Sequence, residues 1–235
     1  MAMDYSYIDG NFKEISDRMS AALTLSKRDD APNMLVSIKY ADIDEVEYLV
    51  KNHGVKTVGE NRVQQLLERY DKLKELNLDI HFIGALQTNK VKYIIDKVSL
   101  IQSLDRVELA REIDKQAKKR GLVMDVLIEI NSGREENKSG VLPENLAAFC
   151  DEISSFSAIK VRGFMTMAPK CEKNSEYLKY FCETYQLVLD IWQKKLHNID
   201  IPMLSMGMSD SFEPAIMAGS NMIRIGRMMF NKQVK

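Results

Sequence analysis

The sequence predicts a single closed (β/α)8 TIM barrel with one extra helix at its N-terminus. Eight short apolar segments of strand length alternate with stretches of helical periodicity along the 235 residues. Short apolar strands joined by helices are typical of a parallel sheet that is buried on both faces. The length suits eight such units without a second domain, so we expect residues 1–235 to form one barrel domain. An open doubly wound sheet is the alternative, but no GxGxxG motif follows the first apolar segment.

The first 33 residues predict the extra helix and a connector. Apolar side chains recur at helical spacing over residues 7–25. Residues 26–33 are polar, carry charges of both signs and include a proline, so we expect them to connect the helix to the first strand.

The rest of the chain repeats one pattern, a short apolar strand followed by an amphipathic helix. The predicted strands lie at residues 34–38, 55–58, 80–84, 100–104, 123–130, 159–165, near 204, and at 222–226. The predicted helices lie at residues 43–50, 63–70, 90–96, 107–120, 142–153, 177–192 and 215–218. Aromatic side chains line the helix at 177–192, and we expect them to pack in the core rather than to bind a ligand.

The composition excludes several classes of protein. Lysine and arginine (33) nearly cancel aspartate and glutamate (34), so no overall basic field is present to hold nucleic acid or an anionic membrane. No apolar run approaches the roughly 20 residues of a membrane span, and residues 1–30 lack a signal-peptide core. Cys150, Cys171 and Cys182 have no CxxC spacing, which argues against a disulfide framework or a zinc site. We therefore expect a cytoplasmic protein.

Polar side chains gather where the predicted strands end, which is where such barrels build their active face. Lys39 ends the first strand, Asn61 follows the second, and Arg224 lies within the eighth. Other polar residues in corresponding places are Glu60, His81, Gln87, Asn89, Lys90, Asn131, Ser205 and Ser209. Their convergence predicts a binding site at this end of the barrel.

Lys39 is the candidate nucleophile. In a barrel mouth of low dielectric constant the charged form of a lysine is disfavoured, and the neutral amine can form an imine with an aldehyde or ketone. The alternative is a lysine that extends from a strand end into water. His81 is a candidate general base, with a structural role as its alternative, and Cys150 is expected to pack in a helix.

Residues 204–230 predict an anion site. Each of the two apolar runs in this segment ends at a glycine turn, whose backbone N–H groups can hold a phosphate. Arg224 lies inside the second run, where a buried charge needs a partner. The alternative is a pair of ordinary turns with an arginine bonded to backbone carbonyls.

These motifs resemble the pyridoxal-phosphate homeostasis proteins, which are single-barrel relatives of the N-terminal domain of alanine racemase. The matching segments are VSIK (36–39), GEN (59–61), HFIGALQTNK (81–90), NKSG (137–140), RGFM (162–165), SMGMS (205–209) and IRIG (223–226). They occur in the order of the family and cover nearly the whole chain after residue 33. The resemblance implies an alanine-racemase-like barrel that binds pyridoxal 5'-phosphate (PLP), a form of vitamin B6.

The resemblance also implies roles for individual residues. Lys39 would form the internal aldimine, a Schiff base, with PLP. Arg224 would lie against the pyridine nitrogen, to which a guanidinium group can donate a hydrogen bond but not readily a proton. Ser209 and the backbone around Gly226 and Arg227 would hold the phosphate.

Asn61 and Ser205 would line the pocket of the ring. The chain also departs from the family pattern at four places, one of which is Asn231, where the family has a glycine after the final phenylalanine. Ile38 stands before the lysine where the family usually reads V-S-K, which predicts an inserted residue in the first strand. Arg227 replaces a small residue and Ser211 an aspartate in the predicted phosphate loop.

The function that the resemblance implies is intracellular PLP homeostasis, with PLP held and delivered at little or no turnover. PLP-dependent apoenzymes are the expected recipients, and we expect a monomer. An amino-acid racemase or related enzyme, with Lys39 as base and His81 or a tyrosine as partner, is the alternative. A third hypothesis is a cofactor-free barrel whose Lys39 forms an imine with a sugar phosphate.

Overall fold

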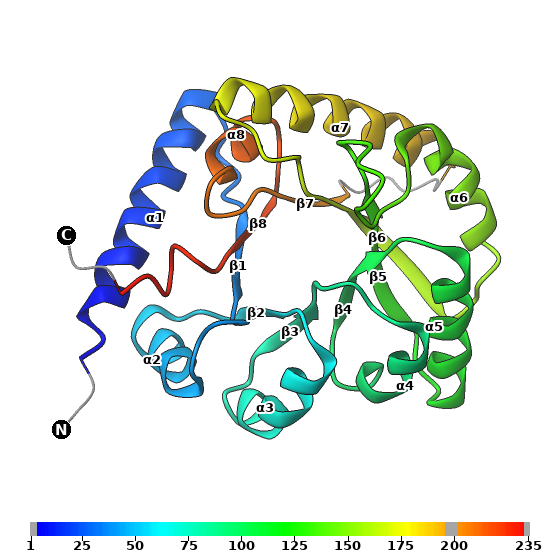
Figure 1. Cartoon of the computed structure of the whole chain (residues 1–235), viewed down its shortest axis with the longest axis horizontal. Helices are drawn as coiled ribbons and strands as arrows, with labels where there is room; N and C mark the ends of the chain where they lie inside the picture. The colour runs from blue at the N-terminus through cyan, green and yellow to red at the C-terminus, as the bar shows by residue number, and fades with distance from the viewer. Residues whose placement is uncertain (1–3, 196–201, 233–235) are drawn as a thin grey trace.

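Eight parallel strands form a closed barrel in the computed structural model, which describes residues 4–195 and 202–232. Figure 1 looks along the barrel and shows the helices outside the ring of strands. Each strand pairs with its neighbours in chain order, and the eighth pairs with the first. The prediction of a (β/α)8 barrel is therefore confirmed.

The elements follow the predicted alternation closely. The strands are β1 (Asn33–Ser37), β2 (Thr57–Glu60), β3 (Asp79–Phe82), β4 (Leu100–Leu104), β5 (Met124–Ile130), β6 (Ile159–Thr166), β7 (Met203–Met206) and β8 (Met222–Ile225). The helices are α1 (Ser6–Ser26), α2 (Ile43–His53), α3 (Val63–Glu75), α4 (Val91–Ile94), α5 (Val107–Lys119), α6 (Leu146–Ile153), α7 (Asn174–Lys195) and α8 (Phe212–Met217). Two short 3₁₀ turns, η1 (Thr88–Lys90) and η2 (Pro143–Asn145), precede α4 and α6.

Helix α1 lies outside the barrel, beside α8 and the C-terminal segment (Figure 1). Arg18 of α1 forms an ion pair with Glu213 of α8, with 2.6 Å between Nη2 and Oε2. Asn11 Nδ2 donates to Met229 O over 3.0 Å. The extra helix therefore supports the segment that follows β8.

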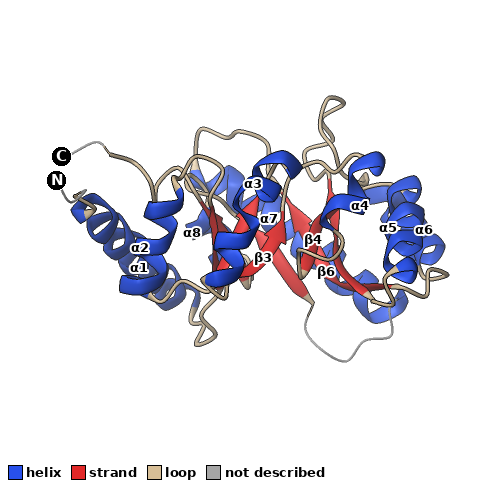
Figure 2. Cartoon of the chain, turned by 90° about the horizontal axis from the view of Figure 1, so that it is seen from below, coloured by secondary structure: helices blue, strands red, loops and turns tan. Residues whose placement is uncertain are grey.

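The core has two parts. Apolar side chains between the sheet and the helices make up the larger part, and Figure 2 shows the helices covering the strands. Inside the barrel, Leu100, Leu127 and Met165 form a smaller cluster, against which Met203 packs. This interior layer is filled with side chains, as expected for a barrel of eight strands.

Local sequence signals explain where helices begin and end. At the start of α2, Asp42 and Glu45 form a capping box, and Gly54 ends the helix with φ 64°. The aromatic residues of α7 divide into two groups. Phe181 and Trp192 are buried in the core as predicted, whereas Tyr177 reaches a cavity at the barrel mouth. No described helix is both long and apolar enough to cross a membrane.

Candidate functional site

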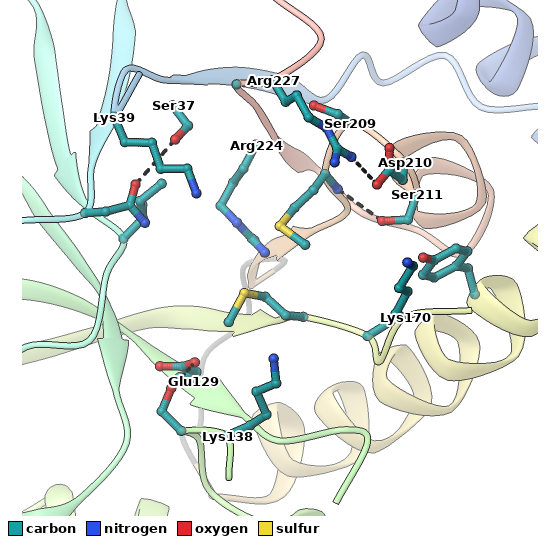
Figure 3. Close-up of a pocket in the computed structure, with 18 of the residues that line it drawn as sticks. Ser37, Lys39, Glu129, Lys138, Lys170, Ser209, Asp210, Ser211, Arg224 and Arg227 are labelled. Atoms are coloured by element: carbon teal, nitrogen blue, oxygen red, sulfur yellow. Dashed lines mark hydrogen bonds and ion pairs between the residues drawn. The ribbon is translucent and has the colours of Figure 1, made fainter. Parts of the chain in front are cut away.

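A cavity of about 470 Å³ opens at the C-terminal ends of the strands (Figure 3). Six residues predicted to bind the cofactor line it, namely Lys39, Asn61, Ser209, Arg224, Gly226 and Arg227. Further polar residues of the lining include Ser37, Glu129, Asn131, Lys138, Lys170 and Tyr177. Closure of the barrel thus brings the first and last strands to one cavity.

Lys39 lies two residues beyond the end of β1, and its side chain extends into the cavity towards Arg224 (Figure 3). Lys39 is exposed, with Nζ 4.6 Å from the centre of the Tyr40 ring. The expectation that the barrel mouth would desolvate Lys39 is therefore wrong. The strand ends before the lysine, so the side chain starts from a turn at the rim rather than from the interior.

The strand leading to Lys39 pairs regularly with β2 and contains no bulge. Ser37 pairs with Gly59 in the β1–β2 ladder, and Ile38 N donates to Gly59 O over 3.0 Å, so pairing is regular. Ser37 and Lys39 face the cavity, whereas Ile38 is fully buried in the outer core. The ordinary alternation of a strand explains the motif, because Ile38 occupies an outward position.

Arg224 forms part of the cavity floor and is largely buried, with 5% of its surface exposed. Its Nη1 donates to Ser205 O (2.6 Å) and Ser205 Oγ (2.7 Å), and its Nη2 donates to Thr166 O (2.9 Å). Burial lowers the pKa of Arg224 to about 10, against the influence of the Glu129 carboxylate. The guanidinium group therefore keeps its charge at neutral pH.

Glu129 was not singled out from the sequence. It lies on β5 with 2% of its surface exposed, faces the cavity, and accepts a hydrogen bond from Ser139 Oγ at 2.8 Å. Burial raises the pKa of Glu129 above its ordinary value. An acidic residue inside the apolar run VMDVLIEI is the signal that would have identified it.

The loops after β7 and β8 are joined at Ser209. Its Oγ accepts a hydrogen bond from the backbone N–H of Met228 at 3.2 Å, and the hydroxyl keeps its own hydrogen as a donor. At Gly226 a Cβ atom would lie 3.0 Å from Ser37 O, so this glycine lets the two strand ends approach closely. Such a junction of backbone and hydroxyl donors suits a phosphate group.

The two departures in this loop have separate structural roles. Arg227 is exposed and forms an ion pair with Asp210 across the loop junction. Ser211 is buried, and its Oγ accepts a hydrogen bond from Met208 N at 3.2 Å, which closes the turn. The Ser211 hydroxyl thus serves the loop backbone.

Ser205 and His81 do not line the cavity. Ser205 is fully buried and contacts Arg224 from the barrel interior. His81 is also buried and hydrogen bonds to Gln102 and Asp79, so it does not reach the cavity as a base. Cys150 is buried in the core on α6, as expected.

The fold and this site define a barrel of the alanine racemase type. The family "Alanine racemase, N-terminal domain" matches residues 15–233. Similar proteins include the pyridoxal phosphate homeostasis protein of Aquifex aeolicus, 47% identical over 77% of this chain and 79% of its own length. That of Helicobacter pylori is 33% identical over 92% of this chain and 94% of its own. The chain belongs to the family of pyridoxal phosphate homeostasis proteins.

A solved structure shows the same fold. The structure of PipY from Synechococcus elongatus, with PLP bound, has a TM-score of 0.79 to this chain at 24% sequence identity. The match covers 92% of this chain and 100% of PipY. The likeness therefore extends over the whole barrel.

Proposed function

We propose that this protein binds PLP in the cavity at the barrel mouth and takes part in PLP homeostasis in the cytoplasm. The observation that carries the proposal is the meeting of Lys39, Arg224 and Ser209 at one cavity of about 470 Å³. These residues provide an amine, a guanidinium group and a hydroxyl in a loop junction. The names of its relatives and the PLP bound to PipY support the same assignment.

The residues of the cavity fit PLP. Gly226 has no Cβ beside Ser37, so its backbone can lie close to a ligand, and Ser209 lines the same cavity. Bound PLP supplies an electrophilic aldehyde and a ring that accepts electrons. In the proposal Lys39 holds the aldehyde end covalently, Arg224 faces the ring, and the Ser209–Gly226–Arg227 junction holds the phosphate. Asn61, directly after β2, borders the ring.

Arg224 suits storage better than catalysis. Its pKa of about 10 means that it donates a hydrogen bond at neutral pH while keeping its proton. A ring nitrogen that is not protonated makes a weaker electron sink. We therefore propose little or no turnover, with release of PLP to PLP-dependent apoenzymes by a monomeric protein. The exposed position of Lys39 supports exchange, because the amine lies at the rim.

Reduction with borohydride tests the proposal. Purified protein incubated with PLP should retain a chromophore, and borohydride should fix one PLP to the peptide that contains Lys39. Lys39→Ala should lose this label, whereas Lys170→Ala, which removes another lysine of the same cavity, should keep it. Protein that takes up no PLP, or a label on another peptide in the unmodified chain, would overturn the proposal.

The second candidate is an amino-acid racemase, which the position of Tyr177 favours. Tyr177 lines the same cavity as Lys39 and comes from a different element, α7. A lysine and a tyrosine at one site can serve as two proton carriers. Chiral chromatography after incubation of the PLP-loaded protein with L-alanine separates the candidates. Sustained racemisation that Tyr177→Phe abolishes would establish the enzyme and exclude a pure carrier.

A further inference from the structure

A chain of hydrogen bonds crosses the barrel interior below the cavity. Arg224 Nη1 lies 2.7 Å from Ser205 Oγ, which lies 2.7 Å from Gln102 Oε1. Gln102 Nε2 lies 2.9 Å from His81 Nδ1, and His81 Nε2 lies 3.0 Å from Asp79 Oδ2. Strands β8, β7, β4 and β3 each contribute to this chain, which links the cavity floor to the opposite end of the barrel.

Most members of this chain are buried, so each needs its hydrogen-bond partners. Arg224, Ser205, Gln102 and His81 are each at most 5% exposed. Asp79 begins β3 at the N-terminal end of the barrel, and its side chain is 47% exposed. A buried polar group without a partner costs stability, so each member of the chain is held by its neighbours.

The donor and acceptor of each bond follow from the chemistry of the groups. The Asp79 carboxylate can only accept, so His81 Nε2 carries a hydrogen, and Nδ1 is an acceptor when the ring carries that hydrogen alone. Gln102 must then present its amide NH2 to His81. Its second N–H lies 3.3 Å from Met222 Sδ, a weak acceptor, which agrees with this orientation.

The orientation of the Gln102 amide then determines the direction in which the Ser205 hydroxyl donates. Because Gln102 Oε1 faces Ser205, the hydroxyl donates to it and leaves its lone pairs for Arg224. All four bonds therefore donate in one direction, from Arg224 towards Asp79. The guanidinium group is fixed by this bond together with those to Ser205 O and Thr166 O.

We propose that Gln102 is a positioning residue for Arg224: it orients the Ser205 hydroxyl as an acceptor and so sets the direction in which the guanidinium group faces the cavity. His81 and Asp79 fix the orientation of Gln102 from the far end. The proposal rests on the proposed function in one respect, namely that Arg224 faces the ring of PLP. The order of donors and acceptors does not depend on it.

The first test determines the direction of the hydrogen bonds in the protein without PLP. Long-range ¹H–¹⁵N correlation spectra distinguish the two neutral forms of a histidine ring, and a His81→Gln variant identifies the signals of His81. We expect a hydrogen on Nε2 and none on Nδ1 in the protein without added PLP. A hydrogen on Nδ1 would overturn the proposal, because Gln102 would then face His81 with its carbonyl oxygen and Ser205 with its NH2 group.

The second test uses the absorbance and affinity of bound PLP to detect a change in the orientation of Arg224. Gln102→Met keeps the bulk of the side chain but removes the acceptor for Ser205. We expect a shifted absorbance maximum and a PLP dissociation constant raised about three- to tenfold, with borohydride labelling still at Lys39. Gln116→Met is the matched control, because Gln116 is a buried amide on α5, outside the barrel interior. It should leave the spectrum and the dissociation constant unchanged.

Ser205→Ala provides a second variant if Gln102→Met does not fold, since it removes only the hydroxyl link and keeps the bond to Ser205 O. It should shift the absorbance in the same direction. Folded Gln102→Met or Ser205→Ala protein with unmodified absorbance and affinity would overturn the positioning role. Failure of the unmodified protein to bind PLP would instead refute the proposed function, while the histidine spectra would still decide the direction of the chain.

Discussion

Glu60 Oε1 lies 3.3 Å from Arg69 Nη1, and this pair supports the segment that carries Lys39. Arg69 Nη1 also donates to Ile38 O at 2.9 Å, and Gln65 Nε2 donates to Lys39 O at 3.0 Å. Helix α3 thus holds the two backbone carbonyls at the end of β1. Lys39 is exposed, but side chains of α3 hold its backbone in place. One of them, Arg69, is itself held by the buried carboxyl group of Glu60.

Replacement of Glu60 by Gln should change how stability depends on pH. Glu60 is fully buried, and its Oε2 has no hydrogen-bond partner in the described part of the chain. Burial raises the pKa of this carboxyl to about 7, although Arg69 acts in the opposite direction. The folded protein therefore binds this proton more tightly than the unfolded chain does. The stabilisation is present below about pH 4.5 and is lost as the pH rises to about 7.

The Glu60→Gln variant has no titrating group at this position, so it should not lose stability for this reason as the pH rises. Its free energy of unfolding relative to the unmodified protein should rise between pH 5 and pH 8, by at most about 3 kcal/mol. Urea unfolding at the two pH values measures this difference. Glu68→Gln, at an exposed position of α3, should give the same difference at both. If Glu60→Gln also gave the same difference at both, the carboxyl would be charged throughout.

Replacement of Ser209 by Ala should weaken PLP binding. The change removes the hydroxyl donor at the junction of the β7 and β8 loops and the acceptor for Met228 N–H. A hydrogen bond to a charged group contributes about 1.5–3 kcal/mol, so we expect the dissociation constant to rise at least about tenfold. Spectroscopic titration with PLP measures it. Ser155→Ala, an exposed serine after α6, should bind PLP like the unmodified protein, and equal affinity of Ser209→Ala would place the phosphate elsewhere.

Replacement of Gly226 by Ala should crowd the cavity floor. Its Cβ would lie 3.0 Å from Ser37 O and 3.1 Å from Ser37 Cβ, so the ends of β1 and β8 would have to separate. Overpacking of this kind costs about 1–3 kcal/mol of stability. Gly10→Ala, at an exposed position of α1, meets no atom within 4 Å and should stabilise by about 0.5–1 kcal/mol. Thermal unfolding distinguishes them, and a stabilised Gly226→Ala protein would contradict the close approach.

Most of the fold follows from the sequence, because strands buried on both faces and amphipathic helices have clear periods. The predicted strand at 100–104 coincides with β4, and the helix at 7–25 differs from α1 by one residue at each end. Lys39 and Arg224 could be assigned to one site from the sequence, because both belong to specific motifs at the first and last strands. Barrel closure then places β1 beside β8.

The rest of the site depends on which way each side chain points, and composition alone does not give that. Glu129 and Gln102 lie in apolar strands, where facing the interior rather than the helices is decided by register. Tyr177 belongs to an aromatic series whose members Phe181 and Trp192 are buried in the core, and only the start of α7 reaches the cavity. The exposure of Lys39 depends on the exact end of β1, and strand ends are the least predictable feature of a sequence.

The last prediction concerns Arg227, which follows Gly226 in the predicted phosphate loop. Its side chain is 69% exposed and already paired with Asp210, which is 67% exposed, so we propose that only its backbone N–H serves the phosphate. Arg227→Ala should then raise the PLP dissociation constant less than about threefold and, as expected for a surface ion pair, change stability by less than about 1 kcal/mol. Asp210→Ala should behave alike, since it removes the other half of the pair.

The titration that measures Ser209→Ala also measures these two variants. A direct contact between the guanidinium group and the phosphate would instead cost Arg227→Ala about tenfold or more in affinity. Asp210→Ala would then bind PLP more tightly than the unmodified protein, because Arg227 would be released from its partner. Opposite effects of the two substitutions would therefore show that the side chain, and not the backbone, holds the phosphate at this position.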